Sequence, residues 1–308
     1  MKKKFKKNIL ITGITGFIGS HLEKKLEEMG ATVYGISTSV KKKNIEKINI
    51  LDLAAVDKFA KSKKISIYIH LAAESLVESG SDNPHQTFKV NSLGTLNILE
   101  VSRLNKSERI IIASSSHVYG KNKAPYYEES SLKPSRPYET SKACADLIAQ
   151  SYADSFKLPV IIPRFVNIYG PGDLNFNRII PRTIKSIIEN KPSEMWGGDV
   201  LRDYLFIEDA VKAYLLLLQV DVNKIDKNRI FNFGSGNVAT VKELIEKIIE
   251  ISGTKMQIKK IPPRREFEIR SQFLSDLKAK RLLGWNPKHT LEEGLKKTIP
   301  WYKAYLRK

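Results

Sequence analysis

Two side chains in the middle of the chain have the types and spacing that proton transfer requires. Tyr138 and Lys142 lie four positions apart, so they share one face of a helix, and Pro137 suits the first turn of that helix. A phenol is a poor base at its free pKa of about 10, but a neighbouring ammonium stabilises the phenolate. The pair therefore predicts a general base that takes a proton from a hydroxyl group. Because this spacing is common on surface helices, the prediction depends on the preceding segment.

A serine-rich string precedes the pair. The apolar run 109–113 is typical of a buried parallel strand, and Ser114, Ser115, Ser116 and His117 follow it. Side chains at the carboxyl end of such a strand face the ligand crevice of a doubly wound sheet. The alternative is a turn that caps itself with its own hydroxyls. An imidazole titrates near neutral pH, so His117 is either a catalytic group or a neutral hydrogen-bonding residue.

Three glycines follow a short apolar run near the start of the chain. Residues 8–11 are typical of a buried strand, Gly13, Gly16 and Gly19 come next, and apolar residues then recur at helical spacing as far as Met29. Gly13 permits a tight turn, Gly16 lets the backbone approach a pyrophosphate, and Gly19 lets helix and sheet pack closely. The helix start offers N–H groups to the phosphates. This order predicts a bound dinucleotide and, with Tyr138, transfer of a proton and a hydride.

The end of the next strand indicates which nicotinamide cofactor binds. An NAD site usually has a carboxylate there for the ribose 2′-hydroxyl, whereas this chain has Ser37 after the strand 31–36, and then lysines at 41–43. The missing carboxylate and the nearby lysines favour NADP, with NAD as the alternative. If the lysines do not contact a 2′-phosphate, they belong to a solvent-exposed loop. Asp52 is expected to accept a hydrogen bond from the adenine amino group.

Strand-like and helical patterns alternate through about residue 165. They predict an α/β fold, with a doubly wound parallel (Rossmann) sheet and a smaller C-terminal substrate-binding lobe. We expect a dinucleotide-binding domain over residues 1–165, joined by about 204–234, and a mainly substrate-binding lobe over 166–308. Thr240 is placed to cap a helix over 241–251, and 230–233 is a further strand.

The composition narrows the choice of partners. The net charge is +19, from 52 Lys and Arg against 33 Asp and Glu. No nucleic-acid-binding motif accompanies this charge, so we expect it to attract anionic small substrates and no specific nucleic acid. No apolar run is long enough to cross a membrane, and the single cysteine, Cys144, fits a reducing compartment. We expect a cytoplasmic protein with no membrane partner and no metal site.

The chain resembles the extended short-chain dehydrogenase/reductase family, and within it the NAD(P)-dependent nucleotide-sugar epimerases and dehydratases. The motifs that carry the resemblance run nearly from end to end, at 12–19, 70–73, 91–95, 114–120, 138–142, 164–172, 202–209 and 283–287. The resemblance implies an enzyme that acts on a nucleotide-diphosphate sugar at C4. It also implies a homodimer, formed through helices near 86–103 and 138–156.

The resemblance assigns roles residue by residue. Ser115 would hydrogen-bond the sugar hydroxyl at C4, Tyr138 would act there as base or acid, and Lys142 would bind the nicotinamide ribose. The implied cofactor-binding positions are Gly13, Thr15, Gly16, Phe17, Ile18, Gly19, Ser37, Asp52, Leu53, Leu71, Ala72, Ala73, Asn91, Tyr138 and Lys142. The implied substrate-binding positions are Ser75, Ser116, Asn167, Arg178, Arg202 and Arg265, of which Arg202 suits a diphosphate oxygen.

Ser116 and His117 bear on the reaction class. The 4,6-dehydratases of the family carry an acidic pair, or Asp and Lys, at these places, to remove a C5 proton and protonate the leaving 6-hydroxyl. Serine cannot replace that acid, so the string resembles the 4-epimerases, whereas segments 172–181, 271–275 and 301–305 resemble the CDP-glucose 4,6-dehydratase branch. We predict a nucleotide-sugar 4-epimerase that acts through a 4-keto intermediate. The alternatives are an NADPH-dependent 4-keto-sugar reductase, a 4,6-dehydratase that uses His117 as a catalytic group, and a non-enzymatic cofactor-binding regulator.

Overall fold

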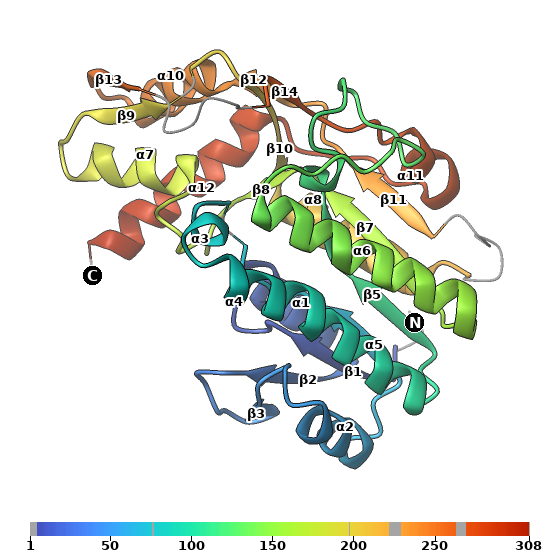
Figure 1. The fold of residues 1–308 in the computed structure, drawn as a ribbon. Helices are drawn as coiled ribbons and strands as arrows, with labels where there is room; N and C mark the ends of the chain where they lie inside the picture. Colours follow the sequence, from blue (N-terminus) through green and yellow to red (C-terminus); the bar gives the residue numbers. More distant parts are fainter. Residues whose placement is uncertain (1–4, 76, 197, 222–228, 263–268, 308) are drawn as a thin grey trace. The chain divides into compact units, whose positions relative to one another are not determined.

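A parallel sheet forms the core of the first of two structural units (Figure 1). The computed structural model describes residues 5–75, 77–196, 198–221, 229–262 and 269–307. The first unit comprises Met1–Lys121, Glu128–Arg164 and Tyr214–Phe231, and the second comprises Asn122–Tyr127, Phe165–Ala213 and Asn232–Lys308. The units thus divide between Arg164 and Phe165 and again between Ala213 and Tyr214, and the short segment 122–127 belongs to the second unit. The functional division into a dinucleotide-binding domain and a substrate-binding lobe stays a prediction.

The order of the strands in this sheet is β11-β7-β5-β4-β1-β2-β3, with β6 beside β7. The strands are β1 (Asn8–Thr12), β2 (Thr32–Ser37), β3 (Ile45–Lys47), β4 (Ile67–His70), β5 (Arg109–Ile112), β6 (Ser114–Ser115), β7 (Val160–Phe165) and β11 (Ile230–Phe233). The pairings from β3 through β7 are parallel. From β1 the chain adds strands first on one side, as β2 and β3, and then on the other side, beginning with β4. Ligands bind at such a switch point, here between β1 and β4, in sheets of this kind. The predicted doubly wound sheet is confirmed.

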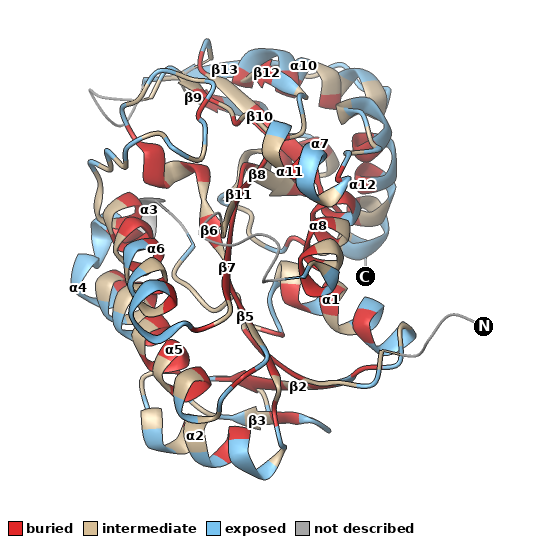
Figure 2. Cartoon of the chain, turned by 90° about the vertical axis from the view of Figure 1, so that its right-hand side faces the viewer, coloured by how far each residue is buried: buried red, intermediate tan, exposed pale blue. Residues whose placement is uncertain are grey.

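Helices cover both faces of the sheet, with α5 and α6 on one face and α1 on the other (Figure 2). The helices and turns of this part are α1 (Phe17–Glu28), α2 (Leu53–Ser62), α3 (Val77–Asp82), α4 (Pro84–Phe88), the π-helical segment η1 (Lys89–Leu93), α5 (Gly94–Leu104), the 3₁₀ turn η2 (Ser116–Tyr119) and α6 (Pro137–Phe156). Helix α8 (Ile207–Gln219) begins in the second unit and ends in the first. Leu10, Ile110 and Ile162 of the strands pack in one apolar cluster with Ile98 and Ala149 of the helices. Strands covered on both faces need apolar side chains on both, which explains their nearly continuous apolar sequence.

The second unit contains a smaller sheet in the order β12-β10-β14, with β8 beside β10, and a separate pair, β13 and β9. Its elements are β8 (Asn167–Tyr169), α7 (Ile179–Ile188), β9 (Ser193–Trp196), β10 (Leu201–Phe206), β12 (Val238–Thr240), α10 (Val241–Ser252), β13 (Ile258–Ile261), β14 (Ser271–Gln272), α11 (Leu277–Leu283) and α12 (Leu291–Leu306). Thr240 caps α10 as predicted, through a reciprocal bond with Glu243, and Thr290 caps α12 in the same way.

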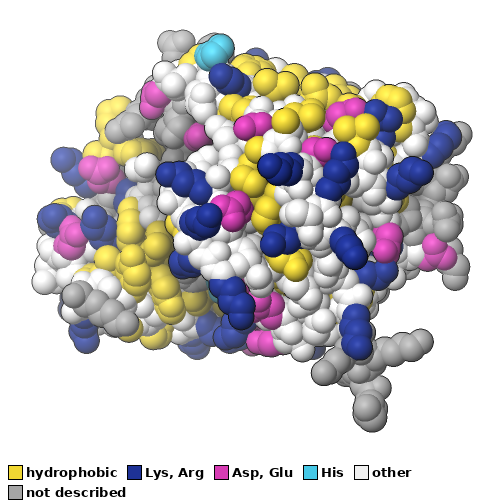
Figure 3. All heavy atoms as spheres, turned by 90° about the horizontal axis from the view of Figure 1, so that it is seen from below, with side chains coloured by type: hydrophobic (Ala, Val, Ile, Leu, Met, Phe, Trp, Pro, Cys, Tyr) yellow, Lys and Arg dark blue, Asp and Glu magenta, His cyan; other side chains and the backbone are white. Residues whose placement is uncertain are grey.

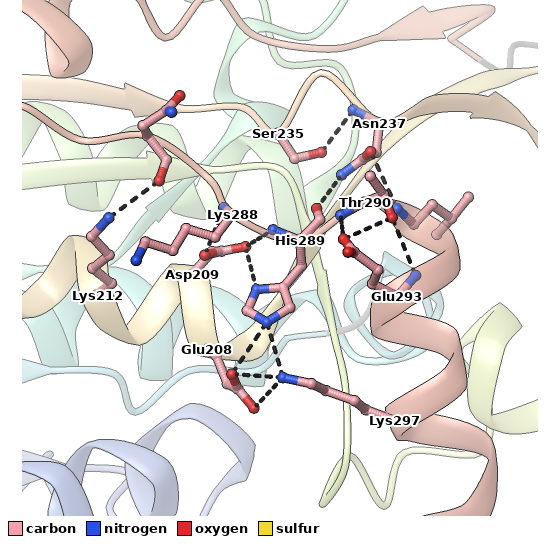
Figure 4. Close-up of polar contacts among 12 residues, drawn as sticks. Glu208, Asp209, Lys212, Ser235, Asn237, Lys288, His289, Thr290, Glu293 and Lys297 are labelled. Carbon is pink, nitrogen blue, oxygen red and sulfur yellow. Dashed lines mark hydrogen bonds and ion pairs between the residues drawn. The ribbon is translucent and has the colours of Figure 1, made fainter.

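A buried carboxylate ties the start of α8 to the segment before α12 (Figure 4). Asp209 is 2% exposed and accepts hydrogen bonds from the backbone N–H groups of Lys288 and His289, each at 3.0 Å. Its side chain also lies 3.0 Å from Nδ1 of His289, whose Nε2 is 3.0 Å from the ammonium of Lys297. These contacts join the motif at 202–209 to the residues that follow the motif at 283–287. None of the helices that the structure describes has the length and apolar content that a membrane crossing needs.

Candidate active site

The predicted base and its ammonium lie on the first turns of α6. Pro137 is in the first turn, as the sequence predicted, and Tyr138 and Lys142 are each only 8% exposed. Nζ of Lys142 donates a hydrogen bond to the carbonyl oxygen of Ala113 at 2.5 Å, which places the ammonium at the carboxyl end of β5. Burial lowers the pKa of Lys142 to about 8, and the carboxylate of Asp146 opposes this shift. Lys142 is therefore still mostly cationic at neutral pH.

The serine string meets this helix, as the order of motifs predicted. The hydroxyl oxygen of Ser115, the last residue of β6, accepts a hydrogen bond from the N–H of His117 at 3.3 Å and so begins η2. The imidazole of His117 stands edge-on to the ring of Tyr138, with 5.6 Å between the ring centroids. Ser116 is only 2% exposed, so its hydroxyl faces the protein interior. The structure thus brings Ser115, His117 and Tyr138 together.

A buried ion pair that local sequence patterns do not reveal fixes the string to α6. The carboxylate of Asp146 accepts hydrogen bonds from Nε and Nη2 of Arg164, at 2.9 and 2.8 Å, and from the hydroxyl of Ser114 at 2.6 Å. Arg164 is 1% exposed and Asp146 is fully buried. Burial alone would lower the pKa of Arg164, but its bonds with Asp146 raise it above the ordinary value. The guanidinium therefore stays charged inside the protein.

Asn91 orders the segment between β4 and α6. It lies in η1, and its amide oxygen accepts the N–H of Glu74 at 2.8 Å, while its amide nitrogen donates to the carbonyl oxygen of Glu74 at 3.0 Å and to the hydroxyl of Ser141 at 2.9 Å. The hydroxyl of Ser141 in turn donates to the carbonyl oxygen of Tyr138. Because these bonds use the whole amide, Asn91 supports the catalytic helix, and its direct contact with a cofactor stays a prediction.

A buried histidine connects this network to the glycine turn. Nδ1 of His70 lies 2.7 Å from Oγ1 of Thr12, and its Nε2 lies 3.1 Å from Oγ1 of Thr95, which itself donates to the carbonyl oxygen of Asn91. Burial lowers the pKa of His70 to about 3, so its ring is neutral. Since the hydroxyl proton of Thr95 is already donated, Nε2 of His70 must carry the ring proton and Nδ1 must accept from Thr12.

The glycine turn has the geometry that a dinucleotide phosphate requires. Gly13 has a φ of +70°, and a Cβ placed on Gly19 would lie 2.4 Å from the carbonyl oxygen of Gly13. Around Gly16, by contrast, a Cβ would meet only that same oxygen, at 3.1 Å. Gly16 caps α1 with no side chain, and the first turn of α1 contains no acidic residue. The open N–H groups and the dipole of α1 therefore fit a pyrophosphate.

The end of β2 differs in part from what the sequence suggested. The hydroxyl oxygen of Ser37 accepts N–H groups from Ser39 and Val40 at 3.3 Å, so it is engaged in its own turn. The ammonium of Lys41 pairs at 2.7 Å with Glu46, a carboxylate on β3 that the sequence reasoning overlooked. Asp52 caps α2 through a 2.9 Å bond from the N–H of Ala55, which leaves its second oxygen for other partners.

Known proteins resemble the chain over nearly its whole length. The NAD dependent epimerase/dehydratase family matches residues 9–234. The chain belongs to this family. The dTDP-D-glucose 4,6-dehydratase of Homo sapiens is 30% identical over 97% of this chain and 91% of its own length. The structure of UDP-glucose 4-epimerase from Thermotoga maritima, with UDP-glucose, has a TM-score of 0.90, with 30% identity over 97% of this chain and 99% of that one. A mutant UDP-glucuronic acid 4-epimerase from Bacillus cereus, in complex with NAD, has a TM-score of 0.89, with 26% identity over 97% of this chain and 99% of that one.

The family establishes the chemistry in outline. The protein is an enzyme of the NAD-dependent nucleotide-sugar epimerase/dehydratase group. The 4-epimerases and the 4,6-dehydratases match the chain about equally well, so membership of the family is compatible with either reaction. Among the residues that the structure describes, no group of His, Cys, Asp and Glu side chains could hold a metal ion.

Three of the expected substrate-binding side chains lie in the second unit. Asn167, on β8, donates to the carbonyl oxygen of Asp203 at 3.4 Å, and Arg178, which precedes α7, pairs with the carboxylate of Asp173 at 3.1 Å. Arg202, on β10, donates through Nη1 to the carbonyl oxygens of Leu201 and Ile269. Ser75 is exposed on the first unit, and Arg265 lies outside the described residues. The substrate-binding roles of these residues stay predictions.

Proposed function

We propose that the enzyme is a nucleotide-sugar 4-epimerase. The observation that carries the proposal is that Ser116 and His117 follow Ser115, and that Glu139, the carboxyl group paired with His117, is ionised. Ser116 is a buried hydroxyl, and Glu139 is fully buried. Burial alone would raise the pKa of Glu139, but His117, the N–H of Ser135 and the charge of Arg136 together bring it below its ordinary value. An ionised Glu139 cannot protonate a leaving 6-hydroxyl, which a dehydratase must do.

The side chains of this site suit a reversible oxidation at C4. The phenolate of Tyr138 takes the proton of the C4 hydroxyl, which Ser115 holds, and Lys142 stabilises the phenolate. A nicotinamide held at the glycine turn and by Lys142 would supply the acceptor, and later the donor, of the C4 hydride. After the 4-keto sugar has turned over, so that its other face is reduced, Tyr138 gives the proton back to the oxygen. Protons and electrons balance, and the cofactor is not consumed.

We also propose which residues bind the ligands. Gly13, Gly16 and Gly19 hold the dinucleotide, and Arg178 and Arg202 bind the nucleotide-diphosphate sugar. NADP should bind more tightly than NAD because no carboxylate stands at Ser37, although the pairing of Lys41 with Glu46 weakens this preference. Lys and Arg on the face shown in Figure 3 are interspersed with Asp and Glu, which does not favour a specific nucleic-acid partner.

A homodimer completes the proposal. Apolar side chains on and beside α5 and α6 remain substantially exposed: Leu93 at 43%, Leu104 at 46%, Leu147 at 54% and Phe156 at 52%. Large exposed apolar side chains on adjacent helices favour association. Leu147→Glu should therefore convert a dimer into a monomer in light scattering after size exclusion, and a monomeric wild type would contradict the proposal.

A 4,6-dehydratase is the second candidate, and the observation that favours it is the imidazole of His117 beside Tyr138. One experiment separates the candidates. The purified enzyme is incubated with a panel of nucleotide sugars in D₂O, and the products are analysed by NMR. The proposal predicts a 4-epimer with no net change in cofactor. A new C6 methyl group with deuterium at C5 would support the dehydratase, and stoichiometric loss of NADPH with a 4-keto sugar would support a reductase.

Tyr138→Phe is the control for the role of the hydroxyl. The variant should bind the cofactor as the wild type does and lose about 10²–10⁴-fold in turnover, which is the usual contribution of general acid–base catalysis. Near-wild-type turnover would contradict the assignment of Tyr138 as the base.

A further inference from the structure

Two buried polar atoms face each other beside Tyr138, and neither has a hydrogen-bond partner among the described residues. Oε1 of Glu139 lies 3.7 Å from Nδ1 of His117, which is longer than a hydrogen bond and within ion-pair range. Both atoms are buried and lack a hydrogen-bond partner within the described part of the chain. The other carboxylate oxygen of Glu139, Oε2, accepts the N–H of Ser135 at 3.0 Å and its hydroxyl at 3.3 Å. Only Oε1 is therefore directed at the imidazole.

An ionised carboxylate in the interior needs a donor at each oxygen, because an unpaired buried charge is costly. His117 can satisfy Oε1 only when its proton is on Nδ1. A short movement of the ring shortens 3.7 Å to a hydrogen bond, and such bonds are often long in enzymes without ligand. The pKa of Glu139 lies below its ordinary value, so the carboxylate is anionic at neutral pH.

The second ring nitrogen of His117, Nε2, remains available to accept a hydrogen bond. The side chain of His117 is 20% exposed, whereas Nδ1 is buried, so the exposed surface belongs to other atoms of the side chain, and Nε2 is not among the buried atoms without a partner. With the proton on Nδ1, the second nitrogen, Nε2, carries a lone pair and can only accept. The backbone of His117 is held by Ser115, and its ring lies edge-on to Tyr138. A neutral imidazole in one fixed tautomer is a proton acceptor in the physiological pH range.

We propose that Glu139 is a positioning residue, which holds the proton of His117 on Nδ1 so that Nε2 is a hydrogen-bond acceptor beside Tyr138. Nε2 then accepts a hydrogen bond from a hydroxyl group of the sugar ring close to C4, while the proton of the C4 hydroxyl itself goes to Tyr138. This part rests on the proposed function, whereas the state of the His117–Glu139 pair does not. The arrangement supplies an acceptor without an acid, since Ser116 is a buried hydroxyl and Glu139 stays ionised.

Nitrogen NMR of the histidine side chains tests the pair directly. The chain has five histidines, so ¹⁵N-histidine labelling gives a simple spectrum, and His117→Gln assigns the signal. The spectrum is recorded at about pH 8, above the ordinary His pKa of about 6.5. We expect His117 to carry its proton on Nδ1 and the buried His70 to carry its proton on Nε2, as an internal control. A proton on Nε2 of His117 in the wild type overturns the proposal.

Glu139→Gln adds a second measurement. The amide of Gln can donate to Nδ1, so the proton should move to Nε2 of His117 while His70 is unchanged. Glu243→Gln makes the same change in the first turn of α10, where no histidine is involved, and should leave both signals as they are. An unchanged His117 tautomer in Glu139→Gln overturns the positioning role. If that variant does not fold, the wild-type spectrum still decides.

Enzyme kinetics then tests whether the lone pair on Nε2 of His117 takes part in the reaction. With a nucleotide sugar that the enzyme converts, Glu139→Gln should lower kcat about tenfold with little change in KM, which is in the range of one hydrogen bond to the reacting sugar. His117→Ala should lose as much, and the double variant should lose no more than His117→Ala alone, because the two residues act as a unit. Additive losses would contradict action through His117. If no sugar is converted at all, the proposed function fails, but the NMR result on the pair stands.

Discussion

Asp146→Ala should lower the free energy of unfolding by about 3–5 kcal/mol, because it leaves the guanidinium of Arg164 buried without its counter-charge. The carboxylate of Asp146 receives bonds from Nε and Nη2 of Arg164, from Ser114 and from Gln150, at 2.6 to 2.9 Å. Neither charged side chain is more than 1% exposed. Water therefore cannot replace the lost partner, and the cost falls in the upper range for single substitutions.

Urea unfolding followed by circular dichroism measures this cost. With a denaturant slope of about 3 kcal/mol per M, the midpoint should fall by about 1–1.7 M. Asp146→Leu combined with Arg164→Met removes both charges and leaves apolar side chains of similar size, so it should regain most of the lost stability. A loss below about 1 kcal/mol in Asp146→Ala would refute the reasoning. A double variant as unstable as the single one would show that the unpaired charge is not the cause.

Three further predictions concern the cofactor turn, the buried lysine and the second unit. Gly19→Ala should weaken cofactor binding at least tenfold, about 1.4 kcal/mol, in calorimetric titration, because its Cβ would lie 2.4 Å from the carbonyl oxygen of Gly13; unchanged affinity would contradict the predicted phosphate cradle. The folded-state pKa of Lys142, about 8, lies below its unfolded value, so the cost of burying the charge is complete below pH 8 and is relieved as the pH rises toward 10.5. Urea titrations should therefore show Lys142→Met as more stable than the wild type, by a margin that is about 3 kcal/mol larger at pH 7 than at pH 10.5. A stability difference that does not change with pH would argue against the lowered pKa of Lys142. Asp209→Ala removes the acceptor of two backbone N–H groups and of His289, and should cost about 2–4 kcal/mol in thermal unfolding, with Glu208→Ala, at an exposed position, as the nearly neutral control.

The features that the sequence predicted well are those that local patterns determine. A strand, three glycines and a helix follow one another within about two dozen residues, and β1 and α1 begin and end close to the expected positions. The same holds for the start of α6 at Pro137 and for the cap of α10 by Thr240. In these segments the backbone conformation depends on neighbours in the chain, so the residue types alone are informative.

The features that were missed depend on residues far apart in the chain. Nothing in the local sequence of α6 distinguishes Asp146 or Glu139 from ordinary helical acids on a solvated face. Their roles follow from Arg164, 18 positions further on, and from His117, 22 positions earlier. At β2 the sequence suggested a cation available to a cofactor phosphate, Lys41, but this ammonium pairs with Glu46. The pairing depends on β3, which lies parallel to β2 and was not predicted.

The reaction class depends on where protons reside close to Tyr138, and for this reason residue types alone leave it open. In the arrangement that we propose, His117 offers a neutral acceptor at Nε2. Expulsion of a hydroxyl also needs an acid, and the carboxyl group that faces His117, Glu139, is ionised. The hydrogen bond that would orient His117 thus uses Glu139 as an acceptor and not as a proton donor. One interaction would then account both for the acceptor at Nε2 and for the lack of a donor at Glu139, which is the combination that distinguishes the proposed 4-epimerase from a dehydratase on the same fold.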